Sequence, residues 1–181
     1  PGGTPKKPQV KTSSSSETLA GGKTKETTTK TFTDADGNVT HKEVQDLIKN
    51  AKGEIESKIQ KRENFDATTG VKTGTTEIAT SYNNKDGTST QLKTNYDAMG
   101  KKKSTLKTTN TGTTKKEFDE AGREKKITTR SRDGSSSVRT NSFDASGTLD
   151  SYIEEKRDTA GRRTEYFKMN VKTGARTDLP K

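Results

Sequence analysis

A short turn signal recurs along most of the chain, in which an aspartate or asparagine is followed within a few residues by a glycine. The Asp or Asn side chain can accept hydrogen bonds from nearby backbone amides, and glycine readily adopts the positive φ that closes a hairpin. Turns at such regular intervals predict an antiparallel meander of short strands. The instances are Asp34 to Gly37, Asn50 to Gly53, Asp66 to Gly70, Asn84 to Gly87, Asp97 to Gly100, Asn110 to Gly112, Asp119 to Gly122, Asp133 to Gly134, Asp144 to Gly147, Asp158 to Gly161 and Asn170 to Gly174.

Every second turn in much of the chain is preceded by an aromatic residue. In a meander, alternate turns lie on the same edge of the sheet, so these aromatic residues are expected side by side along one edge. The pattern defines a two-strand repeat of about 22 to 33 residues. The predicted aromatic edge consists of Phe65, Tyr96, Phe118 and Phe143, with Phe32 as a looser member.

The apolar content limits how thick the fold can be. Only 22% of the 181 residues are hydrophobic, whereas typical globular domains have nearly half their residues apolar. Between turns, apolar and polar residues alternate, as in Ile78, Thr80 and Tyr82, which would share one face of a strand. We therefore expect a mainly β fold, with hairpin repeats forming an open, thin or single-layer sheet.

Three segments are expected along the chain. Residues 1–30 contain Pro, Lys, Ser and Gly with almost no apolar side chain, which predicts a flexible basic arm. Residues 31–64 form either a first hairpin or a helical segment. Apolar residues recur at helical spacing over 41–62, yet Gly53 interrupts that pattern and fits the hairpin rhythm, so both structures stay open. Residues 65–178 form the hairpin repeat region.

The sequence offers little for catalysis or metal binding. It has no cysteine and one histidine, His41, which excludes disulfides, thiolate metal sites and sites with two imidazoles. Asp34, Asp36 and Glu43 match ligand positions of an EF-hand calcium loop, but Phe32 stands at the first ligand position and offers no oxygen. We therefore expect a simple turn here, no cofactor and no catalytic residue.

The charge balance is basic, with 35 Lys and Arg residues against 25 Asp and Glu and a net charge of +10. This balance predicts an acidic partner, although lysines on exposed strands also keep sheet edges soluble. The candidate binding residues are Lys101, Lys102, Lys103, Arg123, Lys125, Arg130, Arg132, Arg162 and Arg163.

Several turn segments resemble the YD repeats of RHS and teneurin proteins, whose units read Tyr-Asp-x-x-Gly-Arg. The similar segments begin at Tyr96-Asp97, Phe118-Asp119, Phe143-Asp144 and Asp158, and the similarity spans about residues 65–174. Members of that family wind many such hairpins into large shells. The resemblance implies a hairpin architecture and a structural role, and it transfers no catalytic residue.

Three functions follow from these features. The first is a non-enzymatic structural or assembly protein whose sheet packs on an acidic lattice or filament or on copies of itself. The second is an extracellular adhesin or binding module, and the third is a nonspecific nucleic-acid binder. The location therefore stays open between secreted or cell-surface and cytoskeletal, and no apolar stretch is long enough to span a bilayer.

Overall fold

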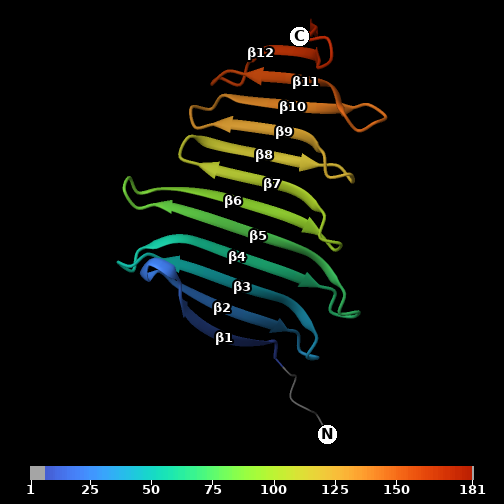
Figure 1. Cartoon of the computed structure of the whole chain (residues 1–181). Helices are drawn as coiled ribbons and strands as arrows, with labels where there is room; N and C mark the ends of the chain where they lie inside the picture. The colour runs from blue at the N-terminus through green and yellow to red at the C-terminus, as the bar shows by residue number, and fades with distance from the viewer. Residues whose placement is uncertain (1–6, 181) are drawn as a thin grey trace. The chain divides into compact units, whose positions relative to one another are not determined.

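The computed structural model describes residues 7–180, and most of them lie in antiparallel strands (Figure 1). The chain divides into two compact units, Pro1–Lys101 and Lys102–Lys181. The first unit contains β1 (Gln9–Thr18), β2 (Thr24–Thr33), β3 (Val39–Lys49), β4 (Ile55–Phe65), β5 (Lys72–Asn83) and β6 (Thr88–Asp97), with a short 3-10 turn, η1 (Ala20–Gly22), after β1. The second unit contains β7 (Lys102–Thr109), β8 (Gly112–Phe118), β9 (Glu124–Ser131), β10 (Ser136–Phe143), β11 (Leu149–Arg157), β12 (Arg163–Asn170) and β13 (Arg176–Asp178).

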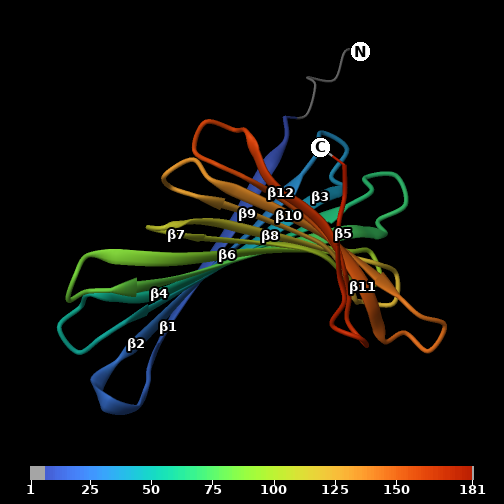
Figure 2. The same ribbon diagram turned by 90° about the horizontal axis from the view of Figure 1, so that it is seen from above.

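Within each unit, every strand pairs with its neighbour in sequence in antiparallel orientation. Inside either unit, the direction of the strands changes progressively from one to the next (Figure 2), as the intrinsic twist of β-strands requires. The predicted fold class, an open antiparallel meander, is confirmed.

The Asp-x-x-Gly signal closes the hairpins by one repeated set of hydrogen bonds. At Asp119, the backbone N–H donates to the carbonyl of Arg123 (3.0 Å), and the Gly122 N–H donates to the carbonyl of Asp119 (3.0 Å). The Asp119 Oδ1 accepts from the N–H groups of Ala121 and Arg123. Gly122 has a φ of 80°, which is why glycine is needed there. The same side-chain pattern occurs at Asp34, Asn50, Asp97, Asp144 and Asp158.

A bulge shifts the strand register just beyond several of these turns. Phe118 pairs with Glu124 although Glu117 pairs with Lys126, so Lys125 of β9 is the extra residue. This bulge is separate from the three-residue loop that Gly122 closes. Equivalent shifts occur at Asn64/Phe65 and Ser142/Phe143.

The expectation of a flexible arm over residues 1–30 is wrong for its described part beyond Pro8. Gln9–Thr18 forms β1, and its ten residues pair in register with β2, which covers Thr24–Thr33. Low hydrophobicity was a misleading signal here, because Ser and Thr suit an exposed strand once its backbone is paired. Residues 1–6 lie outside the described part of the chain.

The alternatives for residues 41–62 are resolved in favour of a hairpin. Strands β3 and β4 pair from His41↔Asn64 to Lys49↔Ile55, and the Asn50 turn joins them. The apolar residues divide between the two faces: Val44 and Ile48 lie on one, and Leu47 on the other. Helical spacing arises by coincidence, since both faces of a thin sheet can carry apolar side chains.

Almost no apolar side chain is fully buried. Among the described residues, the buried set consists of Phe167, which is 4% exposed, and the polar residues Thr75, Thr80, Thr94 and Ser151. Large apolar side chains stay partly exposed on both faces, including Ile59 and Leu92 on one face of the first unit and Tyr82 on the other. Each unit is therefore a single layer without a central core.

Candidate functional site

The pre-turn aromatic residues share an edge and a face within each unit. Phe65 and Tyr96 precede turns at one edge of the first unit, and strand alternation places both rings on one face through the Glu63↔Thr75↔Tyr96 row. Phe118 and Phe143 precede turns at one edge of the second unit, again on one face. We call these the aromatic edge and the aromatic face of each unit, and the other side the opposite face.

A cation lies over several of these rings. Lys42 Nζ is 5.6 Å from the centre of the Phe65 ring. In the second unit, Lys102 Nζ is 5.5 Å from the Phe118 ring centre, and the Arg123 guanidinium is 4.4 Å from that of Phe143. These contacts are favourable because a ring face is electron-rich, and they also cover apolar surface.

Arg123 joins two successive turns on the aromatic edge of the second unit. Its Nε donates to Oδ2 of Asp119 in its own turn (2.8 Å), while its guanidinium covers Phe143 before the next turn. A β-carbon added at Gly147 would stand 3.2 Å from Arg123 Nη1, so the glycine leaves room for this arginine. The arginine of the YD-like motif therefore acts between repeats as well as within its own.

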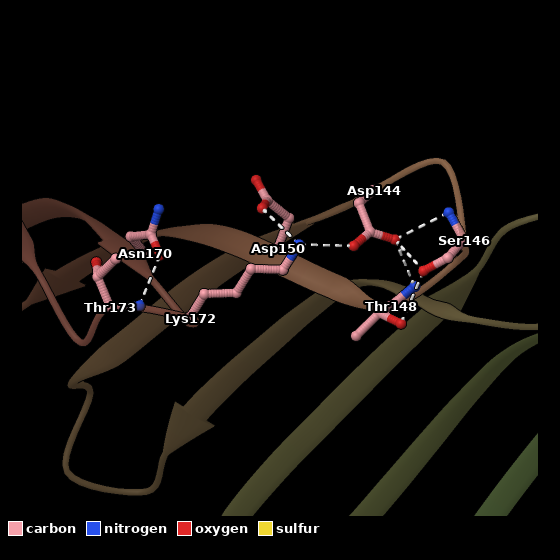
Figure 3. A network of polar contacts seen from close by, with 7 residues as sticks. All are labelled: Asp144, Ser146, Thr148, Asp150, Asn170, Lys172 and Thr173. Atoms are coloured by element: carbon pink, nitrogen blue, oxygen red, sulfur yellow. Dashed lines mark hydrogen bonds and ion pairs between the residues drawn. The ribbon is translucent and has the colours of Figure 1, made fainter.

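A second bridge connects the next two turns on this edge (Figure 3). Lys172 Nζ donates to Asp144 Oδ2 (2.9 Å) and lies 3.9 Å from Asp150 Oδ1. Asp144 Oδ1 also accepts from the hydroxyl and N–H of Ser146 and from the N–H of Thr148. The Ser146 hydroxyl, followed by Lys172, holds the pKa of Asp144 far below its usual value, so this carboxylate stays ionised.

The candidate basic residues do not form one cluster. Arg123 and Arg162 pair with the aspartate of their own turn, and Lys102 lies over Phe118. Lys101, Lys103 and Lys125 are exposed on or near the turn between β6 and β7 or the start of β9. These residues are therefore distributed along turns and strand ends.

The strand register does bring Arg130 and Arg163 into one cross-strand row. Arg130 pairs with Ser136, Ser136 with Arg157, and Arg157 with Arg163, all on the opposite face of the second unit. Arg132 lies in the turn after β9, next to this row. The predicted residues do not include Arg157, because it joins the row only through its pairing with Ser136, and a bulge in β12 then places Arg163 opposite Arg157.

Both faces of the first unit carry nearly balanced charge, whereas basic residues predominate on the opposite face of the second unit. On the opposite face of the second unit the charged strand residues are Lys115, Lys126, Arg130, Arg157, Arg163 and Lys168 against Glu117 and Glu155; on that of the first unit they are Lys30, Lys49, Lys58, Arg62 and Lys93 against Glu26, Glu43, Glu56 and Asp97. On the aromatic face of the second unit they are Lys102, Lys103, Lys107, Lys116, Lys125, Arg139, Lys156 and Arg176 against Glu124, Asp150, Glu154, Glu165 and Asp178, and on that of the first unit they are Lys11, Lys25, Lys42, Lys61 and Lys72 against Glu17, Asp46, Glu63 and Glu77.

The opposite face of the first unit contains a shallow groove of about 440 Å³. Its lining includes Lys30, Arg62 and Lys93, with Glu43 as the acidic member. Arg62 is 3.8 Å from Glu43 and donates to Asn64 Oδ1, so part of its charge is already engaged. The groove is thus polar, and its lining is basic.

The weak calcium candidate does not form a cation site. Asp34 Oδ1 accepts from the N–H groups of Asp36 and Asn38, while Glu43 lies on β3 within 4 Å of Arg62. Phe32 stacks on His41 across the hairpin, with ring centres 4.0 Å apart. Since Val39–Lys49 is a strand and not a helix, it carries Glu43 away from the turn. No cluster of metal-ligating side chains occurs within residues 7–180.

Within the described part of the chain, no helix is long and apolar enough to cross a membrane. Comparison of the sequence with models of protein families and with curated proteins gives no match.

Proposed function

We propose that this chain is a non-enzymatic structural protein whose open sheet lies on an acidic protein lattice or filament or on copies of itself. The single-layer sheet is the observation that carries this proposal. Ile59 on an aromatic face and Ile153 on an opposite face are 38% and 37% exposed, so neither side is sealed from solvent. A partner surface would bury the apolar side chains, and the backbone next to them, that the isolated chain leaves exposed to water.

The distribution of charge supports an acidic partner. Basic residues predominate on the opposite face of the second unit, while the aromatic faces carry paired charges such as Lys61 with Glu63 and Lys156 with Glu165. A surface with an excess of one sign attracts a surface of the other sign and speeds their encounter. The opposite face of the second unit is therefore the side that we expect to meet the acidic partner.

The state of the carboxylates supports a role without catalysis. The turn aspartates, such as Asp34, Asp119 and Asp158, have a pKa below the usual value, with a backbone amide as the main cause. Neighbouring lysines lower the pKa of Glu63, Glu117 and Glu165 in the same direction. Such groups are fixed negative charges that hold turns and strands, and they are poor proton carriers at neutral pH.

The YD-like repeats support the same role. In the family that they resemble, hairpins of this kind build extended walls, and here the repeated turn sets the register of each hairpin in the same way. We propose that the repeat extends a sheet and that the aromatic edge ties one repeat to the next.

Nucleic-acid binding is less well supported. Binding of single strands commonly uses exposed aromatic rings on which bases stack. In the second unit, cations already cover the rings of Phe143, Tyr152 and Phe167. A phosphate-binding surface would therefore have to act through charge alone.

Co-sedimentation with an acidic protein filament, together with sizing and electron microscopy of the purified chain, tests the proposal. We expect either ordered self-assemblies or binding to the filament that weakens as salt rises. A compact monomer that ignores acidic filaments at every salt concentration would contradict the proposal. Salt-sensitive binding to nucleic acid alone would favour the nucleic-acid function, and adhesion to cell surfaces alone would favour the adhesin.

A further inference from the structure

The opposite face of the second unit carries an ordered row of cationic side chains. Across β8 to β12, the row runs Thr113, Arg130, Ser136, Arg157 and Arg163, each paired with the next. Directly paired residues in an antiparallel sheet have side chains on one face. We call Arg130, Arg157 and Arg163 the arginine row, with the two hydroxyl side chains beside and between them.

A single carboxylate serves two of the three arginines. Glu155 Oε1 lies 2.6 Å from Arg157 Nη2 and 3.6 Å from Arg163 Nε. Arg157 Nη1 also donates to the carbonyl of Gly161 (2.9 Å). Arg130 has no ion-pair partner among residues 7–180 that the structure describes. The row therefore keeps an excess of positive charge, and the protein already orients Arg157 and Arg163.

Arg163 is held in place by its surroundings. Its guanidinium carbon lies 4.7 Å from the Tyr166 ring centre, and its Nε is buried without a hydrogen bond. The side chain as a whole is still 32% exposed. Its exposed part therefore lies away from Nε.

A hollow of about 370 Å³ opens beside Arg130. Arg130 and Arg132 line it together with Thr113 and Gly112. A β-carbon at Gly112 would stand 2.2 Å from the carbonyl oxygen of Arg130, so the backbones approach too closely for any side chain there. The hollow is thus a cradle with two arginines and a hydroxyl on its walls.

We propose that the arginine row and this hollow form the site that receives carboxylates from an extended acidic segment of the partner protein. The inference rests on the proposed function and names the chemistry of the contact. Arginine forks bind carboxylates through two parallel hydrogen bonds, and the hydroxyls of Thr113 and Ser136 can donate to the same oxygens. Strands lie about 4.8 Å apart, so Arg130 and Arg157 stand roughly 10 Å apart at their α-carbons, within reach of successive carboxylates on one extended peptide.

The aromatic content of this face favours an acidic peptide over a single nucleic-acid strand. Tyr166 is the ring next to the row, and Arg163 already covers it. A base would have to displace that arginine before it could stack. Carboxylates need only the charges and hydroxyls that the row presents.

Binding of the full chain to poly-L-glutamate, measured by fluorescence anisotropy at two salt concentrations, tests the site. The test variant is Arg130→Gln/Arg132→Gln. The matched control is Lys52→Gln/Lys85→Gln, which removes the same net charge from exposed turns of the first unit. Arg130→Lys/Arg132→Lys keeps the charge and removes the fork, and circular dichroism checks that each variant keeps its strands.

We expect the Arg→Gln pair to weaken binding about fivefold and the lysine control to change it less than about twofold. The Arg→Lys pair should fall between them. Equal losses in the test and control variants would overturn the site while leaving an acidic partner in place. Failure of the wild-type chain to bind polyglutamate, or preference for heparin or an oligothymidylate, would overturn the carboxylate assignment; filament co-sedimentation then decides the proposed function separately.

Discussion

The two units build the same meander by different means. Strands β1 to β6 are 10 to 12 residues long, whereas β7 to β12 are 7 to 9 residues long. Cation–π contacts show the reverse distribution: the described part of the first unit has Lys42 over Phe65, and the second unit has the other six. Long ladders of backbone hydrogen bonds therefore support the first unit, and stacked side chains compensate for shorter ladders in the second.

Phe167 shows how the second unit replaces a core. Arg176 and Lys156 lie 4.0 Å and 5.9 Å from its ring centre, and Tyr152 meets it edge to face at 6.3 Å. The buried residues of the first unit are instead Thr75, Thr80 and Thr94, which are small and polar. A single-layer sheet can thus bury a ring beneath the stems of its own charged side chains.

We expect the largest difference in stability loss between the two units at Gly112, where two backbone segments approach each other most closely. Gly112→Ala should destabilise the second unit by about 3 kcal/mol or more, because the new β-carbon would meet the Arg130 carbonyl at 2.2 Å. Gly87→Ala in the first unit has open space and a φ of 70°, so we expect only about 1 to 2 kcal/mol from backbone strain. Chemical denaturation of both variants checks this, and equal losses would contradict the structure of the β7–β8 turn.

The second-largest loss of stability should follow removal of the buried Phe167 ring. Phe167→Ala should cost about 3 kcal/mol, since it removes the one apolar side chain that is buried in the described structure. Leu92→Ala, at a side chain that is 40% exposed in the first unit, should cost about 1 kcal/mol. The comparison is made from urea midpoints at constant m-value, and a larger loss for Leu92→Ala would point to a second layer over the first unit.

Removal of a cation stacked on an aromatic ring should cause a smaller difference in stability loss between the units. Arg139→Gln should lose about 1 kcal/mol, because the guanidinium lies 3.7 Å from the Tyr152 ring centre. Lys42→Gln should lose about half as much, since its amine is 5.6 Å from Phe65. A double-mutant cycle with Tyr152→Leu isolates the first contact. A coupling energy near zero would show that stacking does not stabilise the second unit.

Acid should affect both units through their turn carboxylates. The folded pKa of Asp144 and of Asp34 lies below the unfolded value, so their contribution is complete above about pH 4 and is lost as the pH falls through the lower folded values. Lys172 adds to the shift in the pKa of Asp144, and Asp34 has backbone amides and Asn38 alone. We therefore expect the free energy of unfolding to depend less on pH in the acid range after Asp144→Asn than after Asp34→Asn. The difference between the two variants should be larger at low salt.

The repeated local signals were sufficient to predict the meander. Asp or Asn at a turn entrance and glycine at its end act through a few neighbouring backbone groups, so the sequence pattern contains the cause directly. The same locality explains the placement of Phe118 and Phe143 before turns of the aromatic edge. Composition failed at Gln9–Thr18, because the stability of that strand depends on its pairing with β2 and not on its own side chains.

The candidate surface was harder to predict than the fold. Arg130 and Arg163 are far apart in sequence, and only the register with Ser136 and Arg157 brings them into one row. A bulge that shifts the register by one residue moves a side chain to the other face. Clusters read along the chain, such as Lys101 to Lys103, are instead divided between a turn and a strand.

Paramagnetic attenuation of methyl signals by a soluble, uncharged relaxation agent tests the single-layer sheet most directly. Ile59 and Ile127 report on the aromatic faces, while Ile78 and Ile153 report on the opposite faces. We predict attenuation of all four methyl sets, with protection confined to the neighbourhood of Phe167. Protection of one whole face in the isolated chain would contradict the account, because it would require a second layer that already covers the proposed binding surface.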